Sequence, residues 1–218
     1  MGNYITFLDA DDVYLPDNLK TKYEYITSTG ADYVYSDLTV CDSEMNEISA
    51  EKGITADKVR DAVLAWQSEN IPGMSSNIMI RHSILKNRNI YFDTNLSNCA
   101  DRYYKILLVS RCKGAYIPKP LAKYRNTPGS MSKKVSLLEH DELYILQKVK
   151  EQNIIPGGKE RNKVFAKVYL MLCGSWYKDA GKTTRAVKFA FKAFLTYPLI
   201  FFGLLNKGFS ILLSGKRK

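Results

Sequence analysis

The sequence contains 218 residues, of which 45% are hydrophobic and 25% are charged, an ordinary composition for a globular protein. It excludes a disordered chain and a collagen-like repeat. The net charge of +10 is uneven, because residues 1–134 carry 17 Lys and Arg against 16 Asp and Glu, whereas residues 135–218 carry 15 against 6. A basic half of this kind indicates binding to nucleic acid or to an anionic membrane surface, and net charge alone does not choose between them.

The cysteines and the first residues indicate in which cellular compartment the protein is found. Met1 to Tyr4 lead directly into an apolar run, without the basic stretch and cleavage site of a secretory signal. The cysteines lie far apart, with neither disulfide-framework nor zinc-ligand spacing: Cys41, Cys99, Cys112 and Cys173. We therefore expect reduced, core-forming thiols and a cytoplasmic protein.

The chain opens with a predicted strand, an acidic loop and a helix. Residues 4–8 are β-branched, aromatic and apolar, which is typical of a buried strand, and Asp9, Asp11 and Asp12 follow at once. Pro16 suits the first turn of a helix, and Gly30 predicts where that helix ends.

Further strands and helices alternate up to about residue 120. We expect, in chain order, a strand within 31–40, a helix from Thr55 with Trp66 on its apolar face, a loop at 72–76, a strand at 77–80, a helical turn at 83–87, a helix at 101–111, and a strand at 115–117 closed by Pro118 and Pro120. This alternation predicts a layered α/β domain.

After about residue 135 the strand signals stop. Three helices are predicted at 136–153, 159–179 and 182–196. Residues 197–218 are apolar and basic but too short and too interrupted by Lys207 to span a membrane, so we expect a tail that lies on an anionic membrane surface. The alternative is a tail packed against its own helices or a partner.

The three aspartates need a positive partner. Carboxylates at the end of a buried strand repel one another unless a cation lies between them. Oxygen ligands without histidine or thiolate select Mg²⁺ or Mn²⁺, and such ions usually complete their coordination with phosphate oxygens. The simpler alternative is that Asp11 or Asp12 caps the following helix and Asp9 is solvated.

Residues 2–19 carry a family resemblance. The run GNYITFLDADDVYLPDNL resembles the G-x-Y-I-x-F-L-D-x-D-D-x-x-x-P-x-x-L signature of family-2 glycosyltransferases, which have the GT-A fold. In that family the D-x-D carboxylates hold the cation that binds the diphosphate of a nucleotide-sugar. The resemblance implies this metal- and donor-binding role for Asp9, Asp11 and Asp12.

A second segment, residues 98–107, resembles the family's x-E-D-x-x-x-x-x-R-L motif, with Ala100 in place of the usual glutamate. In inverting members the aspartate there is the general base, so the resemblance implies this role for Asp101. A carboxylate within reach of the acceptor hydroxyl can take its proton while the metal neutralises the leaving diphosphate. Without the resemblance, Asp101 is an ordinary acid at a helix N-terminus.

Two loops extend the resemblance with less specificity. Residues 73–76 resemble the acceptor-side loop, and Tyr124-Arg125 with Ser130 and Ser132 resembles a Y-R-x-x-x-x-S-x-S segment. If the resemblance holds, Arg125 contacts a phosphate or the acceptor. The alternative is that Arg125 is an ordinary surface arginine. Trp66 either stacks on a sugar or packs in the core.

The resemblance covers residues 1–134 and starts in the middle of the family's pattern. We expect a truncated, Rossmann-like GT-A mixed sheet at 1–134, a helical region at 135–196 and the membrane-associating tail at 197–218. Most of the nucleotide-binding half would be missing, as in a fragment, a split protein completed by a separate chain, or an inactive remnant. The isolated chain would then turn over sugar poorly.

The predicted function is metal-dependent transfer of a sugar from a nucleotide-sugar donor to a glycan or lipid-linked acceptor at the inner face of the cell membrane. The alternative is a non-catalytic helical scaffold or a membrane-associated binding module. Nucleic-acid binding is disfavoured, because the basic residues of the tail alternate with long apolar runs and no aromatic strand platform is evident.

Overall fold

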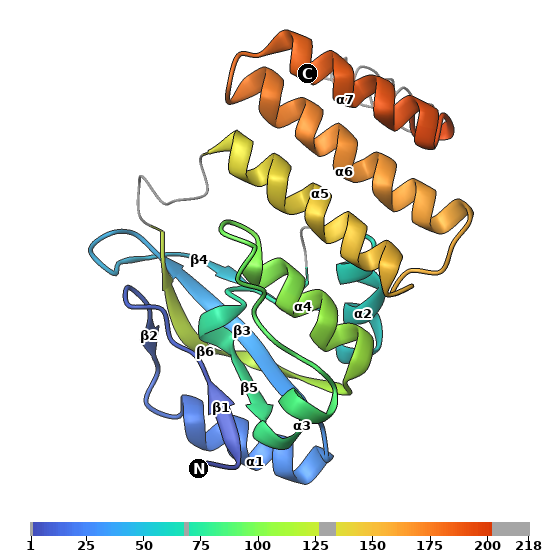
Figure 1. Cartoon of the computed structure of the whole chain (residues 1–218). Helices are drawn as coiled ribbons and strands as arrows, with labels where there is room; N and C mark the ends of the chain where they lie inside the picture. The colour runs from blue at the N-terminus through green and yellow to red at the C-terminus, as the bar shows by residue number, and fades with distance from the viewer. Residues whose placement is uncertain (1, 68–69, 127–133, 202–218) are drawn as a thin grey trace, which may run out of the picture. The chain divides into compact units, whose positions relative to one another are not determined.

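The structure is a computed structural model that describes residues 2–67, 70–126 and 134–201. It divides into two compact units, Met1–Met131 and Ser132–Lys218 (Figure 1). The first unit is a mixed sheet with helices and the second is helical, so the predicted fold class is confirmed.

The sheet of the first unit has the strand order β1-β5-β3-β6-β2, and β4 pairs with β3. β3 and β6 are parallel and the other pairs are antiparallel. Its strands are β1 (Tyr4–Thr6), β2 (Val13–Tyr14), β3 (Tyr33–Cys41), β4 (Glu47–Glu51), β5 (Ile78–Arg81) and β6 (Gly114–Arg125). Its helices are α1 (Asn18–Thr29), α2 (Ala56–Leu64), the short 3₁₀ helix η1 (Ser75–Asn77), α3 (His82–Asn87) and α4 (Ala100–Arg111).

The central strand β3 is buried on both faces. Because side chains alternate along a strand, Val34 points to one face and packs with Ile26 of α1 in a buried apolar cluster. Tyr33 and Tyr35 point to the other face, where the Tyr35 ring stacks on Tyr116 of β6 at 5.5 Å between ring centroids. This burial explains why β3 begins with an apolar and aromatic run, Tyr33 to Tyr35.

The helix after the acidic loop is confirmed. α1 ends at Gly30, whose φ of 63° is left-handed and therefore favours glycine. Its buried face includes Asn18, whose side-chain Nδ2 donates to the Leu121 carbonyl at 2.6 Å. That bond joins the start of α1 to β6.

The strand predicted at 115–117 is longer than expected. β6 continues through Pro118 and Pro120 to Arg125. The register with β3 shifts between Ser36 and Asp37 and again before Thr39, next to these prolines. Proline cannot donate to a ladder and is tolerated at such irregularities, so it interrupts the pairing without ending the strand.

Two further sequence expectations differ from the structure. Trp66 lies beyond the end of α2 with a φ of 51°, so it is not on the apolar helix face where it was predicted. The strands β2 and β4 were not predicted; β2 has only two residues, and every residue of β4 is exposed.

The second unit contains α5 (Val135–Glu151), α6 (Lys159–Lys178) and α7 (Thr183–Thr196), each within two residues of its predicted bounds. Apolar residues such as Ile145, Leu172 and Phe189 are buried. None of the helices in the described part of the chain combines the length and hydropathy that crossing a bilayer requires. Most of the predicted membrane tail, residues 202–218, lies outside the described residues.

Candidate active site

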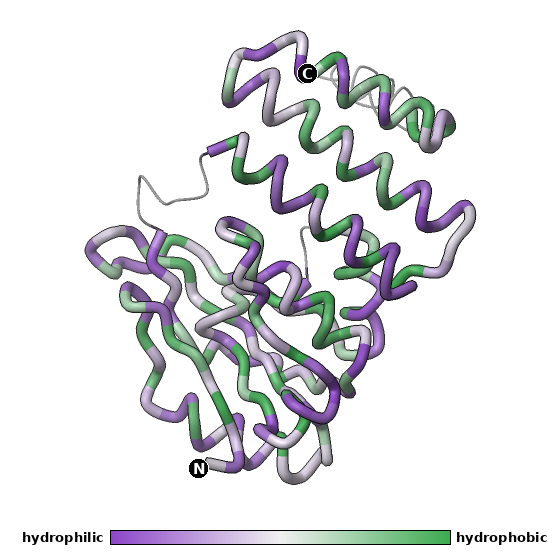
Figure 2. The backbone as a smooth tube through the Cα atoms, in the orientation of Figure 1, coloured by the Kyte–Doolittle hydropathy of each residue, from purple (hydrophilic) through white to green (hydrophobic). Residues whose placement is uncertain are grey.

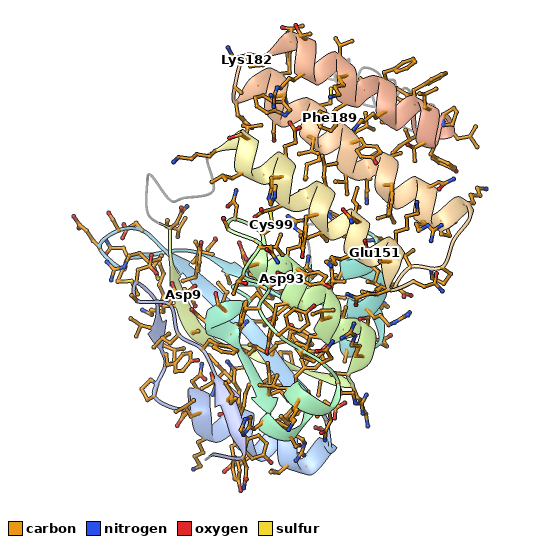
Figure 3. All side chains as sticks on the ribbon, in the orientation of Figure 1. Asp9, Asp93, Cys99, Glu151, Lys182 and Phe189 are labelled. Carbon is orange, nitrogen blue, oxygen red and sulfur yellow. The ribbon has the colours of Figure 1, made fainter. Side chains whose placement is uncertain are left out.

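The three aspartates of the predicted site lie in a short reversal of the chain between β1 and β2, here called the acidic loop (Asp9–Asp12). The Asp12 N–H donates to the Asp9 carbonyl at 3.1 Å and closes a turn. The Tyr14 hydroxyl bonds to the Phe7 carbonyl and to Thr6 Oγ1, each at 2.5 Å. The strand that enters the loop and the strand that leaves it are therefore tied together. Figure 3 shows Asp9 in this loop.

Two serines from a distant segment hold Asp9. The Asp9 N–H donates to Ser76 Oγ at 3.0 Å, and Ser75 Oγ donates to Asp9 Oδ2 at 2.6 Å. Both serines belong to η1, which follows the loop at 72–74. The sequence interpretation placed residues 73–76 on the acceptor side of the site, and the structure brings them directly against the acidic loop.

Asn77 anchors residues 72–76, here called the serine loop. Asn77 was not among the residues singled out from the sequence. Its side chain is fully buried; Oδ1 accepts from Ser36 Oγ at 2.6 Å, and Nδ2 donates to the carbonyls of Ser36 at 2.6 Å and Pro72 at 3.0 Å. Gly73 has a φ of 49°, and a Cβ on it would lie 2.3 Å from Leu38 Cδ2. A side chain at this position would be strained, which favours glycine.

Replacing Asn77 with alanine should lower the free energy of unfolding by about 2–3 kcal/mol, because it leaves buried groups of Ser36 and Pro72 without hydrogen bonds. Urea unfolding measures the change. Asn87→Ala is the control, because Asn87 is exposed at the end of α3. Equal stability of the two variants would contradict the anchoring role of Asn77.

Asp12 is the buried member of the trio. Only 6% of the residue is exposed, Oδ1 accepts from the Arg125 N–H at 3.0 Å, and Oδ2 has no hydrogen-bond partner among the described residues. Burial raises the pKa of Asp12 above its ordinary value; the Ser76 hydroxyl and the Arg125 N–H oppose this rise, and the charges of Asp11 and Asp9 add to it. A buried carboxylate oxygen without a hydrogen bond is costly, and a cation beside it would remove that cost.

Arg125 lies against the acidic loop. Its Nε donates to the Asp11 carbonyl at 3.0 Å, and its Nη1 donates to the Ser43 carbonyl. The guanidinium therefore binds backbone oxygens on both sides. Through these bonds and its own N–H, Arg125 connects the end of β6 to Asp11 and Asp12.

Asp101 is exposed in the first turn of α4, close to Cys99, which Figure 3 labels at the start of that helix. The contacts that hold the acidic loop do not include Asp101. Burial lowers the pKa of Lys105, one turn further, to about 8, and the charge of Asp101 opposes that shift. Lys105 Nζ donates to Asn70 Oδ1 at 2.7 Å, which ties α4 to the segment leading into the serine loop.

An aromatic cluster also connects α4 to the acidic loop. The Tyr104 ring stacks on Phe92 with centroids 4.2 Å apart and meets the Phe7 ring edge-on at 6.0 Å. Phe7 is two residues before Asp9, and Tyr104 is three residues after Asp101, on the same side of the helix. The packing therefore positions the first turn of α4 relative to the end of β1.

The carboxylate oxygens of the acidic loop are of the type that binds a hard cation, although their present arrangement does not by itself form a cation site. Within residues 2–67, 70–126 and 134–201, no three His, Cys, Asp or Glu side chains converge so as to hold a metal ion. Mg²⁺, however, is usually bound by only one or two carboxylates together with substrate phosphates. The free oxygen of Asp12 and the exposed carboxylates of Asp9 and Asp11 meet that lower requirement.

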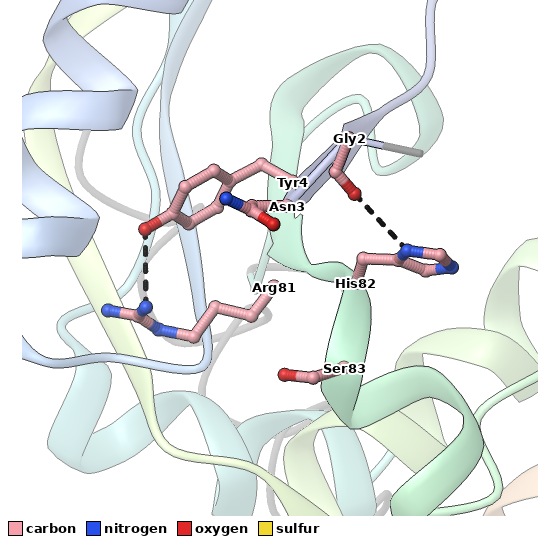
Figure 4. Close-up of a pocket in the computed structure, with 6 residues that line it drawn as sticks. All are labelled: Gly2, Asn3, Tyr4, Arg81, His82 and Ser83. Atoms are coloured by element: carbon pink, nitrogen blue, oxygen red, sulfur yellow. Dashed lines mark hydrogen bonds between the residues drawn. The ribbon is translucent and has the colours of Figure 1, made fainter.

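A hollow at the other end of β1 contains none of the predicted site residues (Figure 4). Its lining residues are Gly2, Asn3, Tyr4, Arg81, His82 and Ser83. Arg81 donates to the Tyr4 hydroxyl at 3.2 Å, to the Ala31 carbonyl at 2.7 Å and to the Ile26 carbonyl at 2.9 Å. These bonds join β1, β5 and the end of α1, and so contribute to the placement of the acidic loop.

The model of the family "Glycosyl transferase family 2" matches residues 1–88, which include the acidic loop and the serine loop. No curated protein matches the chain.

Solved structures of TarS from S. aureus have a similar fold at 14% sequence identity. The crystal structure of TarS 1–349 in complex with UDP-GlcNAc has a TM-score of 0.52, and the match covers 81% of this chain and 49% of that one. The structure of TarS 1–349 alone has a TM-score of 0.50, with 81% and 48% covered. The chain thus spans about half the length of these TarS structures. Residues 1–88 thus match the family-2 glycosyltransferase model, and the fold is similar to that of TarS.

Proposed function

We propose that this protein transfers a sugar from a nucleotide-sugar donor to a glycan or lipid-linked acceptor. The observation that carries the proposal is the acidic loop, in which Asp9 is held by the serine loop and Asp12 keeps a buried carboxylate oxygen free. This arrangement is suited to binding one positively charged ion at the end of β1. The TarS complex with UDP-GlcNAc supports a UDP-sugar as the first donor to test.

The proposed cofactor is Mg²⁺ or Mn²⁺, held by Asp9 and Asp11 with Asp12 adjacent. When bound, such an ion supplies positive charge that neutralises the diphosphate leaving group. Ser75 keeps the Asp9 carboxylate in place through its hydrogen bond at 2.6 Å. The Arg125 guanidinium, which now binds two carbonyls, lies where it can exchange one of them for a phosphate or acceptor oxygen.

Asp101 is the proposed general base of an inverting reaction. Its carboxylate takes the proton of the acceptor hydroxyl, the acceptor oxygen bonds to the anomeric carbon, and the bond from that carbon to the diphosphate oxygen breaks. The exposed position of Asp101 in the first turn of α4 leaves room for an acceptor. The aromatic cluster of Phe7, Phe92 and Tyr104 supports this placement beside the end of β1.

The proposed location is the inner face of the cell membrane, with the protein attached peripherally. The basic charge of residues 135–218 supports this location, since anionic leaflets attract clusters of Lys and Arg. A lipid-linked acceptor would be reached at that surface.

Replacing Asp11 with alanine should weaken Mn²⁺-dependent binding of UDP by about tenfold or more, because the exposed carboxylate contributes to the cation site. Titration calorimetry with UDP, with and without Mn²⁺, measures the change. Asp61→Ala is the matched control, because Asp61 is an exposed aspartate of α2 that forms an ion pair with its neighbour Arg60.

Unchanged UDP and Mn²⁺ binding by the Asp11 variant would reject the donor site. The helical scaffold would then be the better account of the chain. Loss of binding in the Asp61 control as well would show that the effect is not specific to the acidic loop.

A further inference from the structure

Helix α7 exposes a row of large apolar side chains to solvent. Val187 is 61% exposed, Phe191 is 60% exposed and Leu195 is 65% exposed. Residues four apart lie on one side of a helix, so these three form a continuous line, here called the α7 stripe. Phe194, which is 49% exposed, extends it on one flank. Figure 2 shows how much of α7 carries hydrophobic residues.

The α7 stripe is not the face that packs α7 into the second unit. Ala186, Phe189 and Ala193 are buried on the opposite side. The Phe189 ring lies 6.3 Å from that of Tyr169 on α6, and Figure 3 shows Phe189 between the two helices. The helix therefore has two apolar faces, and only one is needed for packing against α6. A second apolar face on one helix indicates a second apolar environment.

The charges on α7 itself have one sign. α7 contains Arg185, Lys188 and Lys192 and no acidic residue. Arg185 lies over the Trp176 ring at 4.6 Å and pairs with Glu139 of α5 at 3.3 Å, and Lys192 lies over the Phe189 ring at 5.4 Å. These two cations therefore lie along the border with the neighbouring helices, and Lys188 is exposed. Residues 180–218 contain no Asp or Glu, and their Lys and Arg are Lys182, Arg185, Lys188, Lys192, Lys207, Lys216, Arg217 and Lys218.

These observations distinguish between possible occupants of the stripe. In a symmetric dimer each α7 would face a second α7, and the cations beside the two stripes would repel each other. An anionic bilayer provides both an apolar interior for Phe191 and Leu195 and negative headgroups for the lysines. Aromatic and aliphatic residues flanked by cations without carboxylates are typical of helices that lie in a membrane interface.

We infer that the α7 stripe is a docking surface for a bilayer rich in anionic lipid, on which α7 lies parallel to the membrane plane. The inference assigns a specific surface to the membrane location proposed above. The choice of a membrane as the partner rests on that proposal. The inference is independent of the sugar chemistry, because all of its residues lie in the second unit.

The test is co-sedimentation of the full chain with vesicles of equal parts phosphatidylglycerol and phosphatidylcholine, and with phosphatidylcholine alone. The Phe191→Ser, Leu195→Ser double variant should bind the anionic vesicles about tenfold or more weakly than the unmodified chain, because two large side chains no longer enter the apolar layer. Lys188→Glu should reduce the preference for anionic over neutral vesicles.

Tyr177→Ser is the matched control, since Tyr177 is 62% exposed on α6 and lies outside the stripe. It should bind vesicles like the unmodified chain, and all variants should unfold at similar temperatures because the changed residues are exposed. Asp11→Ala should also bind vesicles normally, which separates this proposal from the donor site.

Unchanged vesicle binding by the double variant would overturn the inference. Any lipid binding would then come from other basic residues. A dimer of the unmodified chain in the absence of lipid, dissociated by the same double substitution, would also overturn it in favour of a second copy. Weaker vesicle binding by the double variant, with normal UDP binding, would support it.

Discussion

Asp101→Asn is expected to lower the rate of sugar transfer by about 10²–10⁴-fold, because an amide cannot take the proton of the acceptor hydroxyl. UDP binding should change little, since Asp101 is not part of the contacts that hold the acidic loop. UDP release from a UDP-sugar, in the presence of a glycan or lipid-linked acceptor, measures the rate.

The control for this prediction is Asp61→Asn, which replaces an exposed aspartate in α2 and should retain full activity. Two results would contradict the role of Asp101 as base. One is a variant as active as the unmodified chain, and the other is a variant whose UDP binding falls as much as its rate. The second result would place Asp101 among the groups that bind the donor.

Lys22→Met is expected to raise the free energy of unfolding at neutral and mildly acidic pH by on the order of 3–5 kcal/mol. Lys22 is fully buried on α1, and its Nζ has no hydrogen-bond partner among the described residues. The centroid of the Tyr14 ring lies 5.5 Å from Lys22 Nζ, and this cation–π contact only partly replaces the hydration that Nζ loses. Burial lowers the pKa of Lys22 from 10.5 to about 7. Methionine fills similar space without a charge.

The pH dependence follows from that pKa shift. Between about pH 7 and pH 10.5 the unfolded chain binds a proton at Lys22 that the folded chain has lost, so this residue makes stability rise with pH. The advantage of Lys22→Met should therefore be largest at or below about pH 7 and should shrink toward pH 10.5. Urea unfolding across this range measures it.

Lys20→Met is the matched control, because Lys20 is exposed on the same helix. Its effect should stay within about 0.5 kcal/mol at every pH. A Lys22→Met advantage that does not change with pH, or a loss of stability, would show that Lys22 is not a desolvated charge in the folded protein.

The helix bounds were the most predictable feature of this chain. Gly30 ends α1 where the sequence predicted, and α5, α6 and α7 lie within two residues of their predicted ranges. These features depend on apolar periodicity and on the backbone freedom of glycine, which are properties of neighbouring residues.

The extent of the strands was less predictable. Pro118 and Pro120 appeared to end a strand, yet β6 runs through them because β3 accommodates them with register shifts. β4 is short and exposed, and it is held by its pairing with β3. Pairing with a distant strand leaves little trace in the local sequence.

Short runs of neighbouring residues were enough to predict the helices, most of the strands, the family resemblance and the residue types of the acidic loop. Only the tertiary structure decided that Ser75 and Ser76 hold Asp9, that Asp12 is buried with a free oxygen, and that Lys22 is removed from water. The bond from Asp9 to Ser76 spans 67 residues, and that from Arg125 to Asp12 spans 113. Burial and contacts between such distant segments arise only when the sheet forms, so no local pattern encodes them.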